Sequence, residues 1–254
     1  MKSINLQNYI VYISILLSAV YFLTFSVNYE LVLISFLIMQ VKLHCISMFY
    51  HRLITHKSYK TNRWVNRIGC TLATLFNDGS PFTWRAVHSL HHKYTDKKGD
   101  PHSPVIFPSF FKIFDLMASN DAFKERVSLR KNDVLGDYHI FLHHYGSLLL
   151  IALSAFLFVI FGFEEMVMFH LFPIALGNLF VTISTITAHK KIFGSYRTHE
   201  TRDHSQNNIF ISTFFSAGEG MHNNHHKYAG RKRFGEKWWE IDTSAMFIKL
   251  IEVK

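Results

Sequence analysis

The chain has 254 residues, of which 49% are apolar, with 25 phenylalanines but only 5 prolines. Long apolar blocks alternate with polar blocks, which excludes an ordinary soluble domain and indicates a membrane protein. The formal net charge is +9. Because basic and acidic residues are interspersed and no reader motif occurs, nucleic acid is excluded as a partner. The charge suits anionic headgroups, an acidic protein or a negatively charged substrate.

Two apolar blocks near the N-terminus predict the first membrane-spanning helices. Residues 9–27 carry no charge. At about 1.5 Å per residue they can cross a hydrocarbon core of about 30 Å. Residues 31–50 follow after a short break, so we expect a tight hairpin. Lys42 lies in the second block, where it is expected to reach the interface or a protein-lined cavity. No cleavable signal peptide is expected, since the first block lacks a small-residue cleavage site.

Two further blocks, residues 145–163 and 166–188, predict a second hairpin around the sequence GFEEM. His170, near the start of the fourth block, is expected at the membrane interface. Cys45 and Cys70 belong to no C-x-x-C pair. We therefore expect reduced, buried thiols instead of a disulfide.

The charges predict the side of the membrane that each segment faces. The two short turns contain glutamates but no lysine or arginine, and every basic residue except Lys42 lies in the N-terminal tail, residues 51–144 or residues 189–254. By the positive-inside rule these segments, and with them both termini, are cytoplasmic. The sequence thus predicts a single all-α integral-membrane domain over residues 1–254, with four transmembrane helices in two hairpins and a cytoplasmic helical cap.

Histidines gather at four places on the predicted cytoplasmic side. HRLITH follows the second block, HSLHH lies in the middle segment, TITAHKK ends the fourth block, and HNNHH lies near the C-terminus. The candidate metal ligands are His51, His56, His88, His91, His92, His189, His222, His225 and His226. One zinc ion needs far fewer ligands. We interpret the set as a histidine-rich di-metal site in the cap.

The spacing constrains how these histidines divide between ions. On an α-helix, positions i, i+3 and i+4 fall within an arc of about 100°, so each H-x-x-H-H box presents three imidazoles with its adjacent pair splayed apart. Two neighbouring ions could divide such a box. The i, i+5 spacing of His51 and His56 does not stack on one α-helical face. It fits ligands of two different ions, or a helix that ends between them.

A surface histidine is usually only a solvated residue, and one H-x-x-H-H box could be an adventitious metal site. Two boxes and a third motif on one predicted face favour a built metal site. We interpret His139, His143 and His144 as interfacial residues before the third helix. We place His199 and His204 in a solvated loop.

The ligand type narrows the chemistry without naming the metal. Imidazole suits zinc, copper, iron and nickel. A histidine set without a thiolate disfavours a structural zinc site. Two redox-active metals with open positions beside a bilayer indicate oxygen chemistry on a lipidic substrate.

In these motifs the sequence resembles the integral-membrane acyl desaturases of the stearoyl-CoA (delta-9) type. The resemblance rests on HRLITHKSYK (51–60), HSLHHKYTDKKGDPHSP (88–104), TAHKKIFGSYR (187–197) and GEGMHNNHH (218–226). It runs in order from about residue 31 to 228. GEGxHNxHH after an NNIFIS-like strip separates this group from the membrane alkane hydroxylases and sterol-type hydroxylases.

The resemblance implies two iron ions held by the nine histidines, with O2 as co-substrate. It implies removal of two hydrogens from an acyl chain in an apolar tunnel, which leaves a cis double bond. Ala86-Val87 replaces an Arg-Asp pair that contacts coenzyme A in the animal enzymes. Acyl-CoA is favoured as substrate, but carrier-protein and lipid-linked chains stay open.

The electrons are expected from a separate donor, because no HPGG segment, flavin motif or dinucleotide motif occurs. The resemblance implies a donor of the cytochrome b5, ferredoxin or rubredoxin type with its reductase, and membrane lipids as surroundings. The nearest alternative function is a membrane di-iron hydroxylase or acetylenase acting on the same acyl chains. A different class is a non-enzymatic metal-binding or transport protein.

Four further residues are candidates for the surroundings of the metals. Glu219 and Asp100 are expected to orient imidazoles through their free N–H groups. Trp84, four residues before the second box, is expected to line the site. Thr185 stands where the animal enzymes have an asparagine that holds a water on one iron.

Overall fold

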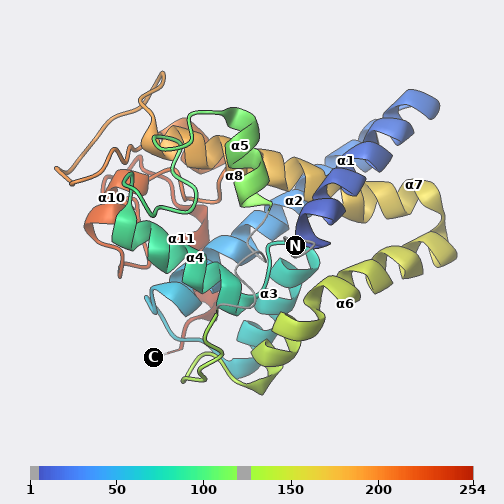
Figure 1. The fold of residues 1–254 in the computed structure, drawn as a ribbon, viewed down its shortest axis with the longest axis horizontal. Helices are drawn as coiled ribbons and strands as arrows, with labels where there is room; N and C mark the ends of the chain where they lie inside the picture. Colours follow the sequence, from blue (N-terminus) through green and yellow to red (C-terminus); the bar gives the residue numbers. More distant parts are fainter. Residues whose placement is uncertain (1–5, 119–126, 254) are drawn as a thin grey trace.

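The computed structural model describes residues 6–118 and 127–253, apart from the side chain of Phe214. Within these ranges the chain is helical, and its only β-pairings are isolated bridges. The helices, coloured along the chain in Figure 1, are α1 (Leu6–Thr24), α2 (Tyr29–Cys45), the π-helix η1 (Ile46–Thr55), α3 (Arg63–Leu75), α4 (Pro81–Tyr94), α5 (Phe110–Met117), α6 (Asp137–Phe161), α7 (Phe163–Met166), the π-helix η3 (Val167–Leu171), α8 (Phe172–His189), α9 (Ile209–Phe214), α10 (His222–Lys227) and α11 (Thr243–Ile251). The predicted all-α fold is confirmed.

Four helical stretches are long and apolar enough to cross a membrane. They are Leu6–Thr24, Tyr29–Thr55, Asp137–Phe161 and Phe163–His189. They overlap the four predicted blocks, although the helices and the predicted spans begin and end at different residues. The second stretch continues to Thr55 and the third begins at Asp137, and several polar side chains in these extensions, among them His51, Arg52 and His143, are buried against protein.

Helix α8 contacts several of the other helices and lies beside α5 in Figure 1. It packs against α1, α2 and α5, so both helices of the first predicted hairpin contact a helix of the second. Helix α6 packs against α3 and α4 instead. It exposes large apolar side chains, among them Leu148 and Val159. Such a face suits contact with lipid.

Local signals set where several helices begin. The side chains of Asn28 and Asn62 cap α2 and α3. Ser80 and Thr83 form a capping box at the start of α4, where Pro81 takes the first helical position. The sequence NDGSP (77–81) thus fixes the start of α4 and the direction in which the histidines of HSLHH project.

Lys42 is buried in the protein instead of reaching the interface. It is 1% exposed, and its Nζ lies 3.5 Å from Oδ2 of Asp78, in the loop between α3 and α4. Its stem passes over Gly177 of α8, where an added Cβ would lie 2.8 Å from the lysine Cδ. Burial raises the pKa of Asp78 to about 6, although Lys42 opposes the shift.

We predict that Asp78→Ala destabilises the protein by about 3–5 kcal/mol, because it leaves the Lys42 charge buried without a partner. The double variant Lys42→Met/Asp78→Leu removes both charges and should recover most of the loss. Thermal unfolding in one detergent measures both. Equal destabilisation by the single and double variants would contradict the prediction.

Candidate metal centre

The two H-x-x-H-H boxes lie on short helices that face each other. His88, His91 and His92 are in α4, and the box of α10 begins at its first residue, His222. Within each box the i and i+4 histidines join one group, and the i+3 histidine joins the other. The predicted splaying of adjacent histidines is therefore what divides each box.

The nine candidate histidines form two groups, each with ligand atoms within 4.8 Å of one another. The five-histidine group consists of His51, His56, His88, His92 and His225. The four-histidine group consists of His91, His189, His222 and His226. All nine are buried or half-buried. The groups adjoin, since the His91 and His92 ring centroids are 5.8 Å apart.

His51 and His56 both belong to the five-histidine group, so of the two alternatives for their spacing the structure favours a helix that ends between them over ligands of two different ions. The reason is that residues Ile46–Thr55 form the π-helix η1, which ends just before His56. The His56 N–H donates to the His51 carbonyl, at 3.0 Å, in the i→i+5 pattern. The wider turn brings residues five apart onto one side, and the ring centroids are 4.8 Å apart.

Nitrogen atoms converge inside each group at the spacing that a shared ion requires. His92 Nε2 lies 2.9 Å from His88 Nε2 and 3.0 Å from His225 Nε2. In the other group, the His189 and His222 Nε2 atoms are 3.1 Å apart. Nitrogens at such distances can share an ion with metal–nitrogen bonds of about 2.1 Å.

Carboxylates fix the opposite nitrogen of several imidazoles. The Nδ1 atom of His51 lies 2.7 Å from Glu219, and that of His91 lies 3.0 Å from Asp100. Nδ1–H therefore donates to the carboxylate and Nε2 keeps its lone pair for the interior of the group. Glu219 and Asp100 are the two acidic residues expected from the sequence to orient imidazoles.

Two further carboxylates orient imidazoles in the same way, and the sequence did not predict them. Asp96 accepts from His189 Nδ1 at 3.0 Å, and Asp203 accepts from His226 Nδ1 at 2.9 Å. Both partnerships span long stretches of chain, so no local spacing announces them. The only available signal was the occurrence of both aspartates beside histidine motifs, in HHKYTD and TRDHS.

Burial and neighbouring charges keep several of the imidazoles neutral. Burial and neighbouring imidazoles lower the pKa of His56 to about 2 and hold the pKa values of His88, His222 and His225 well below the usual value. Burial lowers the pKa of His226 to about 4, against the opposing hydrogen bond to Asp203. Neutral imidazoles offer lone pairs to a metal.

The carboxylates stay ionised in the same surroundings. Burial alone would raise the pKa values of Asp96, Asp100 and Asp203. The hydrogen bonds and attraction to their histidine partners outweigh burial, so all three pKa values lie below the usual range. Each can therefore hold a proton on the Nδ1 atom of its histidine.

A buried nitrogen without a partner is a further sign that a cation belongs here. The Nε2 atom of His226 is buried and has no hydrogen-bond partner. Its other nitrogen is fixed by Asp203, so this atom carries a lone pair directed at the four-histidine group. A metal ion would satisfy it, and hence the residues present fit a bound metal.

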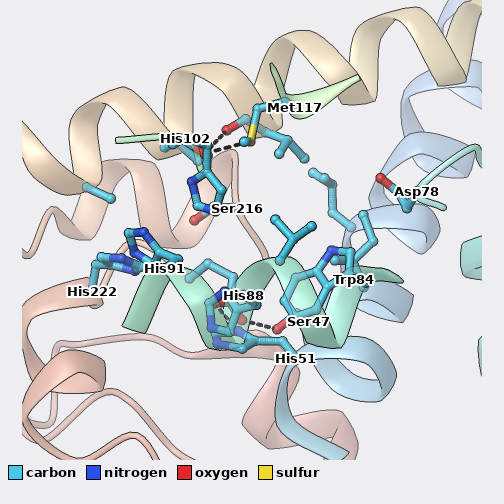
Figure 2. Close-up of a pocket in the computed structure, with 18 of the residues that line it drawn as sticks. Ser47, His51, Asp78, Trp84, His88, His91, His102, Met117, Ser216 and His222 are labelled. Carbon is cyan, nitrogen blue, oxygen red and sulfur yellow. Dashed lines mark hydrogen bonds and ion pairs between the residues drawn. The ribbon is translucent and has the colours of Figure 1, made fainter. Parts of the chain in front are cut away.

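An apolar cavity of about 140 Å³ adjoins both groups. Figure 2 shows His51, His88, His91 and His222 on one side of it and Asp78 on the opposite side. Apolar side chains that line it include Leu43, Ile46, Val87, Met117 and Val181. The cavity thus leads from the histidines to the loop that carries the buried ion pair.

Trp84 and Thr185 both line this cavity. The Trp84 ring stacks on His88, with centroids 4.8 Å apart and planes at 25°. The Thr185 hydroxyl donates to the Val181 carbonyl at 2.9 Å. His102, which the sequence reasoning missed, also lines the cavity and stacks on His91 at 4.5 Å between ring centroids.

The glycines of GEGMHNNHH shape the turn that leads into α10. Gly218 has φ +92, and a Cβ there would lie 2.3 Å from Oδ1 of Asp242. At Gly220 a Cβ would lie 2.5 Å from the backbone nitrogen of Ser212. The close approach leaves Glu219 directed at His51.

The remaining histidines lie outside both groups. His139, His143 and His144 are part of α6 instead of preceding it, and the first two are buried. His199 pairs with Glu236 at 3.0 Å in a partly exposed loop, as expected. His170 is only 2% exposed within η3. It is buried among protein side chains, and its position at the membrane interface stays a prediction.

The fold and the site define a helical membrane protein with a buried all-histidine centre that can hold metal. A model of the fatty acid desaturase family matches residues 28–235. The chain belongs to this family, and it is an oxidoreductase that acts on fatty acyl chains.

Three relatives illustrate the similarity. An sn-1 stearoyl-lipid 9-desaturase of Anabaena variabilis is 29% identical, over 82% of this chain and 75% of its own length. Delta-9 acyl-lipid desaturase 2 of Arabidopsis thaliana is 31% identical, over 82% and 67%. An acyl-CoA C20 Delta5-desaturase of Anemone leveillei is 32% identical, over 80% and 64%. The chain thus spans about two thirds to three quarters of these relatives.

We predict that Gly220→Ala destabilises the protein by about 1–3 kcal/mol and reduces bound metal, because the new Cβ would displace the backbone at Ser212. The control is Gly230→Ala, where a Cβ meets nothing within 4 Å. Thermal unfolding and metal content measure both effects. If the two variants behave alike, the turn is not the constraint inferred here.

Proposed function

We propose that the chain inserts a cis double bond into a fatty acyl chain, using O2 and two iron ions held by the nine histidines. The observation that carries the proposal is the convergence of two histidine groups beside one apolar cavity, in a member of the desaturase family. Iron fits because imidazoles suit it and the chemistry requires a redox metal, which zinc is not.

The overall reaction balances with an external donor. Two hydrogens leave adjacent carbons of the acyl chain, and with two further electrons and two protons they reduce O2 to two waters. When bound, the irons would supply the activation of O2. The donor is a separate protein of the cytochrome b5, ferredoxin or rubredoxin type with its reductase. The basic face proposed to be cytoplasmic suits an acidic donor.

The protein's own residues provide binding, orientation and exclusion of water. The apolar lining from Leu43, Ile46 and Val181 would hold the acyl chain against the histidines. Asp96, Asp100, Asp203 and Glu219 would hold protons on Nδ1 atoms, so that Nε2 lone pairs stay directed at the metals.

The proposal also specifies the molecule to which the acyl chain is attached. Ala86-Val87 offers no charged contact for coenzyme A at the position where the animal enzymes have Arg-Asp. Two of the three relatives are named for action on acyl lipids. We therefore propose a lipid-linked acyl chain, desaturated at a delta-9-like position, as the substrate. This changes the expectation of acyl-CoA that the sequence resemblance favoured.

The same proposal includes a membrane topology. The chain forms one membrane domain that crosses the bilayer four times, with both termini and the metal centre on the cytoplasmic side. The acidic turns at Glu30 and at Glu164–Glu165 would then face the opposite side. Cysteine labelling at the turns and at the C-terminus tests this arrangement.

Expression in a desaturase-deficient host tests the reaction, with gas chromatography of each lipid class. We expect new cis-alkenes that appear first in the intact-lipid fraction. Appearance first in the acyl-CoA pool would overturn the proposed carrier. Hydroxy or acetylenic products without new cis-alkenes would favour the hydroxylase or acetylenase alternative.

We predict that His225→Ala abolishes turnover and lowers the iron content while leaving membrane insertion intact, because its Nε2 contacts those of His51 and His92. His199→Ala is the matched control, since His199 has a carboxylate partner but lies outside both groups. Product analysis and iron content are measured together. Retained activity in His225→Ala would refute its assignment as a ligand.

A further inference from the structure

We infer that the two metal positions are chemically unequal, and that the four-histidine group holds its ion more tightly and in the more readily oxidised form. The inference deepens the proposed function and rests on it, because it concerns the two ions of the same centre. It comes from the distribution of carboxylates around the two groups.

The four-histidine group is rich in carboxylate partners. Three of its four imidazoles donate Nδ1–H to an aspartate, at 2.9 to 3.0 Å. The pairs are His91 with Asp100, His189 with Asp96, and His226 with Asp203. The side chains of Asp100 and Asp96 are 0% and 2% exposed, and that of Asp203 is 12% exposed. Among the described residues, no lysine or arginine side chain forms an ion pair with these three aspartates.

The five-histidine group has a single carboxylate partner in the described part of the chain, Glu219, which contacts His51. Its second oxygen accepts a hydrogen bond from Ser47 and lies 3.4 Å from the Arg52 guanidinium. Arg52 is 0% exposed and also pairs with Asp242 at 2.9 Å. The charge of Glu219 is therefore shared between an imidazole and a buried cation.

The remaining imidazoles of the five-histidine group lack such support. The Nδ1 atom of His225 is buried and has no hydrogen-bond partner. His56, His88 and His92 have no carboxylate partner among the residues that the structure describes. Their imidazoles contact one another and the other histidines instead.

A carboxylate bound to the outer nitrogen of an imidazole changes how strongly its inner nitrogen binds a metal. A carboxylate that accepts Nδ1–H makes Nε2 the stronger electron donor. Stronger donors and nearby negative charge bind a cation more tightly and favour its higher oxidation state. Three aspartates without a basic partner therefore outweigh one glutamate that is paired with Arg52.

The test uses the purified protein with its two irons bound, in detergent. Competition with a chelator measures the affinity of each ion, and Mössbauer spectra during stepwise oxidation show which iron is oxidised first. For the wild type we expect two separate release steps and two separate oxidation steps. Release of both irons in one step, with simultaneous oxidation, would overturn the inference.

Variants of the carboxylates show which release step and which oxidation step belong to which histidine group. Asp203→Asn should weaken the tighter ion by about 10–100-fold and make its oxidation harder, with the looser ion unchanged. Asp96→Asn is a second variant with the same expectation, should the first fail to fold. Glu219→Gln should affect the looser ion only. An effect of Asp203→Asn and Asp96→Asn on the looser ion would contradict the assignment.

Glu236→Gln is the matched control, because Glu236 pairs with a histidine, His199, that lies outside both groups. It should leave both ions unchanged. The outcomes separate this inference from the proposed function. Formation of cis-alkenes by a protein whose two irons behave identically overturns only the inference. If the protein binds Zn²⁺ and makes no alkene, the proposed function fails, and the chelator series with the bound Zn²⁺ still decides whether the groups are unequal.

Discussion

The metal centre depends on one interaction, the hydrogen bond from a histidine Nδ1–H to a buried carboxylate. Without it, closely packed imidazoles could each turn either nitrogen inward, and buried N–H groups would oppose one another. Asp96, Asp100, Asp203 and Glu219 remove that freedom for four of the nine rings. The lone pairs then converge in the interior, where a cation is the only partner that satisfies several of them together.

The helices around the centre are arranged to meet this constraint. The capped start of α4 aims the second box at α10, and the GEG turn allows α10 to approach with Glu219 in place. The π-helix η1 adds His51 and His56 to the same group, which a regular α-helix could not do. The π-helix η1 and the positive φ of Gly218 thus both occur next to the histidine groups and help to position them.

The apolar cavity links the centre to the membrane part of the fold. Its walls come from α2, α4, α5 and α8, so the helices predicted to cross the bilayer also shape the space beside the histidines. Asp78 lies at the side of the cavity away from the histidines (Figure 2), and its ion pair with Lys42 connects α2 to the loop before α4. The part of a chain bound there would be shielded from water by these apolar walls, which suits the proposed chemistry on an unactivated acyl chain.

The sequence by itself determined the four apolar helices, the nine histidines and two of the carboxylates, because hydrophobicity, helical spacing and motif wording are local properties. It predicted that adjacent histidines of a box splay apart, but it did not decide the group of His51 and His56, which lie together through the π-helix η1. The sequence also did not predict the roles of Asp96 and Asp203, because these depend on long-range contacts. Asp96 meets His189 across 93 positions of the chain. The buried state of Lys42 likewise depends on Asp78, a partner supplied by another segment. Local chemistry therefore named the candidate ligands and the splaying within each box, and long-range contacts set how the two groups assemble, how their imidazoles are oriented and which charges surround them.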